Sequence, residues 1–190
     1  MALTVGVLAL QGSVEPHFRI LQEIGVAALE VRKPESLEAV THLVIPGGES
    51  TTLWRLLCLE GLWEILRKRG SSGSLAILGT CAGAIILGMG TEEDPPPRLE
   101  LIDVPVSRNA YGRQIDSFIC PVELCKPYGK GEMEGVFIRA PGFGEPGSGV
   151  EVVAEMAGAG VAFRQGRCLV TAFHPELTSD LQLHRSFLEI

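Results

Sequence analysis

Short apolar runs that alternate with helix-like segments constrain the fold of this chain more than any other feature. TVGVLAL at 4–10, HLVI at 42–45 and LAIL at 75–78 lack the polar alternation of a sheet with one wet face. They therefore predict strands that are buried on both faces. A further strand is expected at 27–31. Helices are expected between the strands, at 16–24, 50–57, 62–69 and 82–87, with Ser50 or Thr51 as the cap of the second.

This order of strands and helices predicts a parallel sheet covered by helices on both sides. The pattern changes after about residue 90, where a proline-rich loop at 91–98 precedes mostly extended segments. These are expected at 101–106, 114–122, 135–138, 150–154, 161–164 and 168–173, with a loop at 141–149 and a closing helix at 179–188. No repeat or linker is visible, so we expect a single α/β domain over 1–190 with additional antiparallel strands.

Composition excludes several classes of function. Hydrophobic residues make up 46% and charged residues 21%, which is typical of a soluble globular chain. The net charge of −7 and the lack of a basic run beyond 67–69 argue against nucleic acid as a partner. No segment is long and apolar enough for a membrane span, and no secretory signal is visible. The five widely spaced cysteines favour a reducing cytoplasm.

The sharpest local signal is GTCAG at 79–83, between the strand LAIL and the helix that follows. A nucleophile on such a turn is exposed at the carboxyl edge of the sheet, and small neighbours let the turn close. The helix that begins after Cys81 also favours the thiolate, which is the nucleophilic form. Taken alone, the segment is equally compatible with a buried cysteine in a glycine-rich turn.

A cysteine nucleophile needs a base, and HPE at 174–176 supplies a candidate. In an extended segment residues two apart share a side, and Pro175 is expected to keep the segment extended. His174 and Glu176 would then project together, so that the carboxylate orients the imidazole. Alone this pair is more often structural, but beside the cysteine turn it predicts a triad. His17 and His184 fall in expected helices and are interpreted as solvated or packed.

Acyl transfer also needs donors for an oxyanion and groups that hold the substrate. The strand end PGG at 46–48 offers a backbone amide near Gly48, which together with the amide of Ala82 would form the oxyanion hole. Arg108 and Arg139 are candidates for binding a substrate carboxylate, because the guanidinium fork bonds both oxygens. Alternatively, PGG is only a tight strand-to-helix turn, and the two arginines are ordinary surface residues.

Six segments, in order through nearly the whole chain, resemble the glutaminase subunit of pyridoxal 5′-phosphate synthase, of the deoxyxylulose-independent route to vitamin B6. They are ALQG at 9–12, PGGESTT at 46–52, GTCAG at 79–83, RNAYGRQ at 108–114, FIRAP at 137–141 and HPELT at 174–178. GTCAG with HPE alone is typical of class I glutamine amidotransferases in general. PGGESTT with RNAYGRQ and FIRAP is far more specific to this family, and the set is a strong signal.

The resemblance implies a flavodoxin-like three-layer α/β domain with a mostly parallel central sheet and additional antiparallel strands. It also implies a hydrolase that releases ammonia and L-glutamate from L-glutamine through a cysteine thioester, without metal or organic cofactor. Carried onto this chain, it assigns the nucleophile to Cys81, the base to His174, the orienting carboxylate to Glu176, glutamine binding to Gly48, Glu49, Ser50, Arg108, Ile138 and Arg139, and a partner-coupled loop to Gln11.

The resemblance further implies a partner, a (β/α)8-barrel synthase subunit in a twelve-plus-twelve lyase complex. That partner would combine the ammonia with ribose 5-phosphate and glyceraldehyde 3-phosphate to make pyridoxal 5′-phosphate, which is a product here. Three alternatives stay open at this point: another cysteine-elbow enzyme of glyoxalase or chaperone type, a glutaminase that serves a different synthase, and a regulatory subunit with an inactive site.

Overall fold

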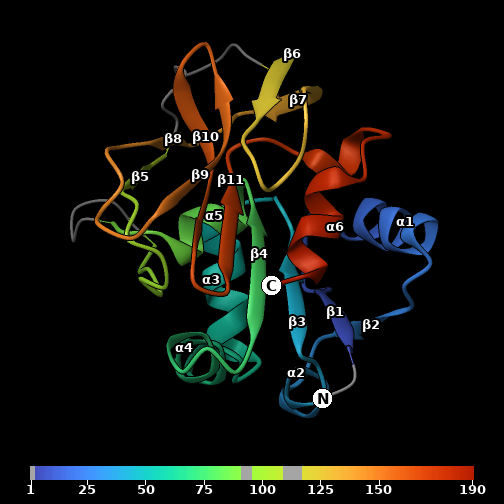
Figure 1. The fold of residues 1–190 in the computed structure, drawn as a ribbon. Helices are drawn as coiled ribbons and strands as arrows, with labels where there is room; N and C mark the ends of the chain where they lie inside the picture. Colours follow the sequence, from blue (N-terminus) through green and yellow to red (C-terminus); the bar gives the residue numbers. More distant parts are fainter. Residues whose placement is uncertain (1–2, 91–95, 109–116) are drawn as a thin grey trace.

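The apolar runs of the amino-terminal half lie side by side as parallel strands. The computed structural model describes residues 3–90, 96–108 and 117–190. The parallel strands follow the order β2-β1-β3-β4-β11, which is the flavodoxin-like order (Figure 1). Their bounds are Val5–Leu8 for β1, Ala28–Val31 for β2, His42–Ile45 for β3, Ala76–Thr80 for β4 and Cys168–Thr171 for β11.

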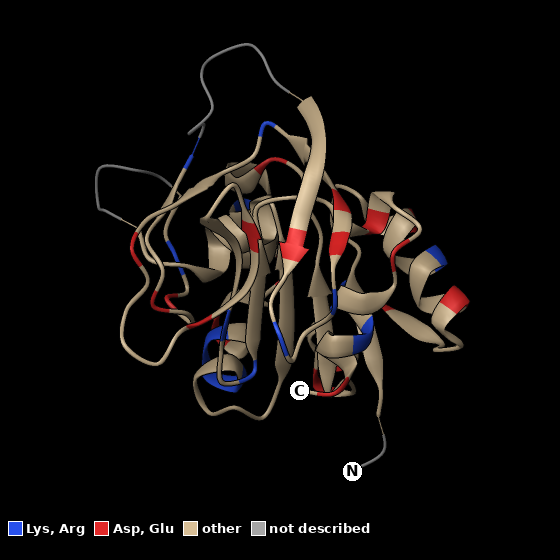
Figure 2. Ribbon diagram, turned by 45° about the horizontal axis from the view of Figure 1, so that its top comes forward, with Lys and Arg blue, Asp and Glu red and all other residues tan. Residues whose placement is uncertain are grey.

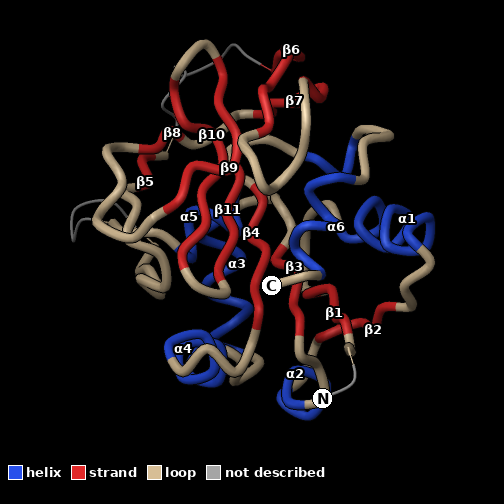
Figure 3. The backbone as a smooth tube through the Cα atoms, in the orientation of Figure 1, coloured by secondary structure: helices blue, strands red, loops and turns tan. Residues whose placement is uncertain are grey.

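Antiparallel strands extend the sheet beyond β11. The order continues β10-β9-β6-β7, so the described residues form one nine-stranded mixed sheet (Figure 3). These strands are β6 (Ser117–Leu124), β7 (Glu132–Ile138), β9 (Glu151–Met156) and β10 (Ala159–Gln165). The short strands β5 (Val106–Ser107) and β8 (Gly142–Phe143) pair separately.

Helices cover both faces of the parallel strands, because successive strand residues point to opposite sides. Val7 joins a core with Leu21 and Phe187, whereas Leu8 joins a second core with Leu53 and Leu66. Helices α1 (Val14–Ile24) and α6 (Gln182–Leu188) supply the first core, and α2 (Pro34–Glu38), α3 (Ser50–Leu59), α4 (Trp63–Ser71) and α5 (Ala82–Leu87) the second. The three-layer α/β fold expected from the sequence is thus confirmed.

Several sequence expectations for individual elements were wrong. The short helix α2 was not anticipated, and the extended segment expected at 101–106 contributes only Val106 to a strand. The loop expected at 141–149 contains β8, and the last helix begins at Gln182 rather than at 179. Residues 91–95 and 109–116, which carry most of the proline-rich loop and of RNAYGRQ, lie outside the described residues.

The basic residues at 67–69 lie in α4, as expected of charge that complements the carboxyl end of a helix (Figure 2). Arg69 donates to the carbonyls of Leu37 and Val40, which ties α4 to the segment before β3. This cluster therefore serves the fold. Within the described residues, the helices are too short or too polar to span a membrane.

The parallel strands bring the candidate site together at their carboxyl ends. Gln11 lies just beyond β1, Gly47 just beyond β3, Cys81 directly after β4 and His174 just beyond β11. The carboxyl edge of an open α/β sheet is where ligands bind in this class of fold. Four segments that are far apart in the sequence thus meet at one edge.

Replacing Phe187 by alanine tests the layer that α6 adds to the sheet. The Phe187 ring is fully buried, so we expect Phe187→Ala to lower the free energy of unfolding by about 3–5 kcal/mol. Urea denaturation measures the change. Leu59→Ala is the control, because Leu59 is 78% exposed and its loss is expected to cost less than about 0.5 kcal/mol. Equal effects of both substitutions would contradict this account of the core.

Candidate active site

Cys81 occupies a strained turn between β4 and α5. Its φ of 49° and ψ of −101° are uncommon for a residue with a side chain. The turn is held on both sides, because Cys81 N donates to Thr171 O at 2.9 Å and Ile85 N donates to Cys81 O at 3.1 Å. The surrounding sheet and helix therefore fix the direction of the thiol.

The two glycines of GTCAG are required by close packing. A Cβ on Gly79 would lie 2.8 Å from the carbonyl carbon of Gly83, and one on Gly83 would lie 2.2 Å from the carbonyl oxygen of Ile45. Both distances are too short for non-bonded atoms. The elbow therefore closes only with hydrogen at both positions, in agreement with the requirement for small neighbours inferred from the sequence.

His174 and Glu176 meet as expected, but through a different backbone. Residues Pro175–Leu177 form a 3₁₀ turn, so the prediction of an extended segment was wrong. Proline fits the first position of such a turn because the N–H it lacks would have no partner there. His174 Nδ1 lies 2.7 Å from Glu176 Oε1, and both side chains are buried. The turn, and not strand alternation, brings them together.

The electrostatics of His174 and Glu176 favour an ion pair between these two side chains. Burial alone would lower the pKa of His174, but hydrogen bonds to Cys81 and Glu176 raise it to about 10. Burial alone would raise the pKa of Glu176, but His17 and His174 outweigh it and lower this pKa. An imidazolium between a carboxylate and a thiol stabilises the thiolate, which is the reactive form.

The loops after β1 and β3 interlock beside this pair. Gly47 N donates to Thr80 Oγ1 at 3.0 Å, and Ser13 N donates to Gly47 O at 3.1 Å. A Cβ on Gly47 would lie 2.3 Å from His174 Cε1, and one on Gly12 would lie 1.8 Å from Gly47 O. The loop after β3 therefore approaches the imidazole, and the loop after β1 approaches the loop after β3, as closely as backbone atoms allow.

Gln11 lies against the candidate oxyanion segment. Its Oε1 accepts a hydrogen bond from Glu49 N at 3.1 Å, and a Cβ on Gly48 would lie 2.3 Å from the same oxygen. Ala82 is the first residue of α5, where backbone N–H groups have no acceptor within the helix. The structure thus places Gln11 beside Gly48, and Ala82 directly after Cys81.

Glu49 caps α3, which corrects the expectation that Ser50 or Thr51 would do so. Its carboxylate accepts from Thr51 N at 2.9 Å and from Thr52 N at 2.7 Å. Burial opposes ionisation and is the largest single effect, but the two amides and the Thr52 hydroxyl together outweigh it and lower the pKa of Glu49 to about 2. Arg108 Nη2 lies 3.6 Å from Glu49 Oε1, so the cap also meets a candidate substrate residue.

A cavity of about 240 Å³ opens beside Cys81 and His174. Ile138 O lies 3.8 Å from Cys81 Sγ across it. The cavity therefore joins the nucleophile to the residues predicted to bind substrate. Among the residues that line it are Gly48, Glu49, Ser50, Arg108, Ile138 and Arg139. Glu176 lies behind His174.

Two histidines that sequence reasoning left aside reach the back of the site. His17 Nε2 lies 3.5 Å from Glu176 Oε2, and His17 Nδ1 lies 3.1 Å from His184 Nε2. The two residues are 167 positions apart and each falls in an ordinary helical pattern. No periodicity could have indicated that they meet.

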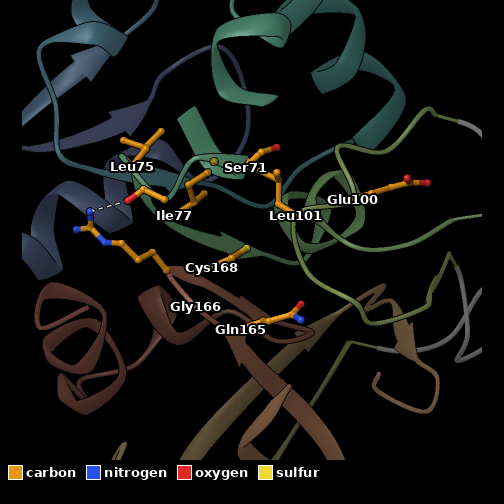
Figure 4. A pocket seen from close by; sticks show the side chains of 11 residues that line it. Ser71, Leu75, Ile77, Glu100, Leu101, Gln165, Gly166 and Cys168 are labelled. Atoms are coloured by element: carbon orange, nitrogen blue, oxygen red, sulfur yellow. Dashed lines mark hydrogen bonds between the residues drawn. The ribbon is translucent and has the colours of Figure 1, made fainter. Parts of the chain in front are cut away.

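A second cavity, of about 320 Å³, contains none of the triad residues. Leu75, Ile77 and Leu101 line it together with polar residues such as Glu100 and Gln165 (Figure 4). Burial raises the pKa of Cys168 there to about 12, so its thiol is protonated. Arg167 donates to Gly73 O and to Ile190 O. We therefore assign the chemistry to the cavity beside Cys81.

A cysteine elbow, a paired histidine and glutamate, and a sheet of this order are together the arrangement of class I glutamine amidotransferases. The chain belongs to the SNO glutamine amidotransferase family, whose model matches residues 7–190. This finding confirms the resemblance drawn from the sequence motifs.

Similar proteins support the same conclusion. A protein of Pelotomaculum thermopropionicum named pyridoxal 5′-phosphate synthase subunit PdxT is 50% identical over 187 residues, which cover 98% of this chain and 94% of the relative. A protein of the same name from Thermus thermophilus is 49% identical over 98% of this chain and 96% of its own. A crystal structure described as a glutamine amidotransferase matches with a TM-score of 0.90 at 49% identity, over 98% of this chain and 97% of that one.

Removal of the Glu49 cap is expected to destabilise the protein in a pH-dependent way. Because its pKa is lower in the folded state, the carboxylate stabilises the fold above about pH 4.5, and this stabilisation is lost as the pH falls toward 2. We expect Glu49→Ala to cost about 1 kcal/mol at pH 7. Urea denaturation from pH 7 to pH 3 should show the difference from wild type shrinking.

Glu30→Ala is the matched control, because Glu30 forms an exposed ion pair with Arg32 and caps no helix. Its effect should stay below about 0.5 kcal/mol throughout. A Glu49→Ala difference that is constant over the pH range would contradict the role of the ionised cap.

Proposed function

We propose that Cys81, His174 and Glu176 act as nucleophile, acid–base and orienting carboxylate of a glutaminase. The chain is the glutaminase subunit of a pyridoxal 5′-phosphate synthase, as its family and its near full-length relatives indicate. One observation carries the proposed roles: Cys81 and His174, which is hydrogen-bonded to Glu176, line the same cavity, and that cavity is also lined by two arginines.

In the first half of the proposed reaction, the Cys81 thiolate attacks the side-chain amide carbon of L-glutamine. The carbonyl oxygen becomes an oxyanion, for which the amides of Gly48 and Ala82 are the proposed donors. His174 gives its proton to the amide nitrogen as the carbon–nitrogen bond breaks. Ammonia leaves, and a γ-glutamyl thioester remains on Cys81.

In the second half, water hydrolyses the thioester. Neutral His174 takes a proton from the water as its oxygen attacks the thioester carbon. The carbon–sulfur bond breaks, L-glutamate leaves, and the thiolate and imidazolium are restored. Glu176 holds the Nδ1–H tautomer of His174 in both halves, so Nε2 faces the reacting atoms.

Substrate recognition is proposed to rest on the cavity wall opposite the triad. Arg108 and Arg139 supply positive charge for the α-carboxylate, and Glu49 offers negative charge for the α-amino group. Gly48, Ser50 and Ile138 complete the wall and leave backbone groups close to the ligand. Arg139 directly follows β7 and has a positive φ of 44°.

The ammonia is proposed to pass to a (β/α)8-barrel synthase subunit, which uses it with ribose 5-phosphate and glyceraldehyde 3-phosphate. The relatives are named as subunits, which supports a synthase partner. A twelve-plus-twelve assembly is the proposed stoichiometry. Gln11 is the proposed coupling residue, because it contacts the Gly48–Glu49 segment and lies in the loop after β1.

We further propose that residues 1–190 act as a single glutamine amidotransferase domain in the cytoplasm. The continuous sheet supports one domain, and the five free cysteines suit a reducing compartment. A glutaminase that serves another synthase is the second candidate. The chain is about half identical, over nearly its full length, to proteins named as pyridoxal 5′-phosphate synthase subunits, which favours a glutaminase of that synthase.

Ammonia release from L-glutamine tests the proposed function. We expect release by the full chain to rise when the synthase subunit is added, and Cys81→Ala to reduce it by at least about 10³-fold, because the covalent route is lost. Cys58→Ala is the matched control, because Cys58 is an exposed thiol on α3 and its loss should leave the rate intact. Absence of release by wild type with the synthase present would refute the proposal.

Substitution of Arg139 tests the proposed carboxylate site. Arg139→Ala should raise KM for glutamine by about 10–100-fold with little change in kcat, because a charge-assisted contact to a non-reacting group is lost. Steady-state kinetics in the presence of the synthase subunit measure both constants. Arg32→Ala, which removes an exposed ion pair elsewhere, should change neither. An unchanged KM in Arg139→Ala would place the carboxylate elsewhere.

A further inference from the structure

A buried polar series continues behind the Glu176 carboxylate. One oxygen, Oε1, meets His174, while the other, Oε2, lies 3.5 Å from His17 Nε2 on α1. His17 Nδ1 in turn lies 3.1 Å from His184 Nε2 on α6. The side chains of His17 and Glu176 have no exposed surface, and His184 is fully buried. Two helices from opposite ends of the chain thus complete the surroundings of one carboxylate.

The charge on Glu176 selects the tautomers of both histidines. An ionised carboxylate only accepts, so the ring nitrogen that faces Oε2 is favoured as an N–H donor. His17 then carries its proton on Nε2, and its bare Nδ1 accepts from His184 Nε2–H. The reverse assignment would direct the lone pair of His17 at the carboxylate. His184 Nδ1, which has no hydrogen-bond partner within the described chain, is then a bare acceptor.

The imidazole of His17 is also connected, through Thr80, to the candidate oxyanion segment. Thr80 Oγ1 lies 3.4 Å from His17 Nε2 and accepts a hydrogen bond from Gly47 N at 3.0 Å. Thr80 also directly precedes Cys81. His17 therefore stands between the carboxylate that orients the base and the hydroxyl that holds the glycine turn.

We propose that His17, oriented by His184, is a positioning residue that holds Glu176 in its ionised, base-orienting arrangement. This inference rests on the proposed function, because it assigns a role behind the same triad. Oε2 makes no hydrogen bond within the described residues, so the His17 N–H at 3.5 Å acts on it through electrostatic attraction. Without this N–H the buried charge on Oε2 would be stabilised less, and the carboxylate would rotate or take up a proton. Either change would release the ring of His174 from its orientation.

The charges around Glu176 agree with this role. Burial lowers the pKa of His17 despite the nearby carboxylate, and burial lowers that of His184 to about 3, so both rings are neutral donors at neutral pH. Other groups that face this region are His174 on its own segment, Cys81 beyond it, and Arg19 and Glu23 on α1, which line a cavity with Glu176. From β7, the Val136 carbonyl accepts from His174 N.

Two amide substitutions at position 17 separate positioning from packing. The side-chain nitrogen of glutamine reaches the place of Nε2, whereas that of asparagine reaches only the place of Nδ1. His17→Gln therefore keeps a donor for Glu176, and His17→Asn loses it. His184→Gln and His184→Asn make the same comparison at the residue that orients His17. They replace the first pair if a substitution at position 17 prevents folding. His42→Gln, at a buried histidine remote from the site, is the control.

Two measurements on the full chain are needed. The first is kcat and KM for ammonia release with the synthase subunit present. The second needs no turnover: the rate at which iodoacetamide alkylates Cys81 from pH 4 to pH 9, followed by mass spectrometry of the peptide that contains Cys81. The acid limb of this rate reports the pH at which the carboxylate, imidazolium and thiolate arrangement is lost.

We expect His17→Asn to lower kcat by at least about 10-fold with KM within about twofold, as for a misplaced catalytic group. The acid limb of alkylation should move upward by about one pH unit, because Glu176 takes up a proton more readily without the donor. His17→Gln should restore most of kcat and the wild-type acid limb, and His42→Gln should match wild type in both. The substitutions at position 184 should follow the same order with smaller changes.

The inference would be overturned if the Gln and Asn variants at position 17 had equal kcat and equal acid limbs. If only the variants at position 184 fold, equal values for that pair would overturn it. The outcome for the proposed function is separate. If wild type releases no ammonia but the acid limbs differ as expected, the glutaminase assignment fails and the positioning role of His17 stands. If wild type is active and the variants do not differ, the positioning role alone fails.

Discussion

The short contact between His174 and Glu176 is the interaction on which the rest of the site depends. A carboxylate buried in an α/β core is unfavourable unless donors surround it. Here the imidazole of His174 supplies one donor at 2.7 Å, and His17 stands 3.5 Å from the other oxygen. The charge that this pair retains inside the protein raises the pKa of His174, and a charged imidazole is what a thiol needs beside it to react.

Close approach of glycine backbones gives this pair its fixed surroundings. Gly12, Gly47 and Gly83 each lie so near another backbone or ring that a methyl group would collide. The loops after β1, β3 and β4 are therefore locked to one another, and not simply adjacent. Strain at Cys81 persists because β11 and α5 hold its amide and carbonyl at the same time.

Much of this arrangement could be predicted from the sequence, for physical reasons that are specific to each element. Buried parallel strands leave continuous apolar runs, so β1, β3 and β4 were visible, and a nucleophile elbow needs glycine at fixed places, so Cys81 was visible too. The 3₁₀ turn at 175–177 was not, because Pro175 is compatible with both an extended and a turn conformation. Glu49 was overlooked as a cap because serine and threonine follow it. The contact of His17 with His184 depends on tertiary packing of two helices, which leaves no local signal.

The strand β7 has a consequence for how far this protein tolerates change in length. Val136 O holds the backbone of His174, Ile138 O faces the thiol, and Arg139 follows at the wall of the cavity. The first two contacts come from alternate residues of one strand, whose register is set by pairing with β6 from Ser117 to Glu123. An inserted residue between Val136 and Ile138 would point one of these two carbonyls toward β6 and away from the site. The turn at 125–131 is fixed as well, because Tyr128 is buried in the core and its carbonyl accepts a hydrogen bond from the Ser186 hydroxyl, so a change in length there would disturb the packing of α6.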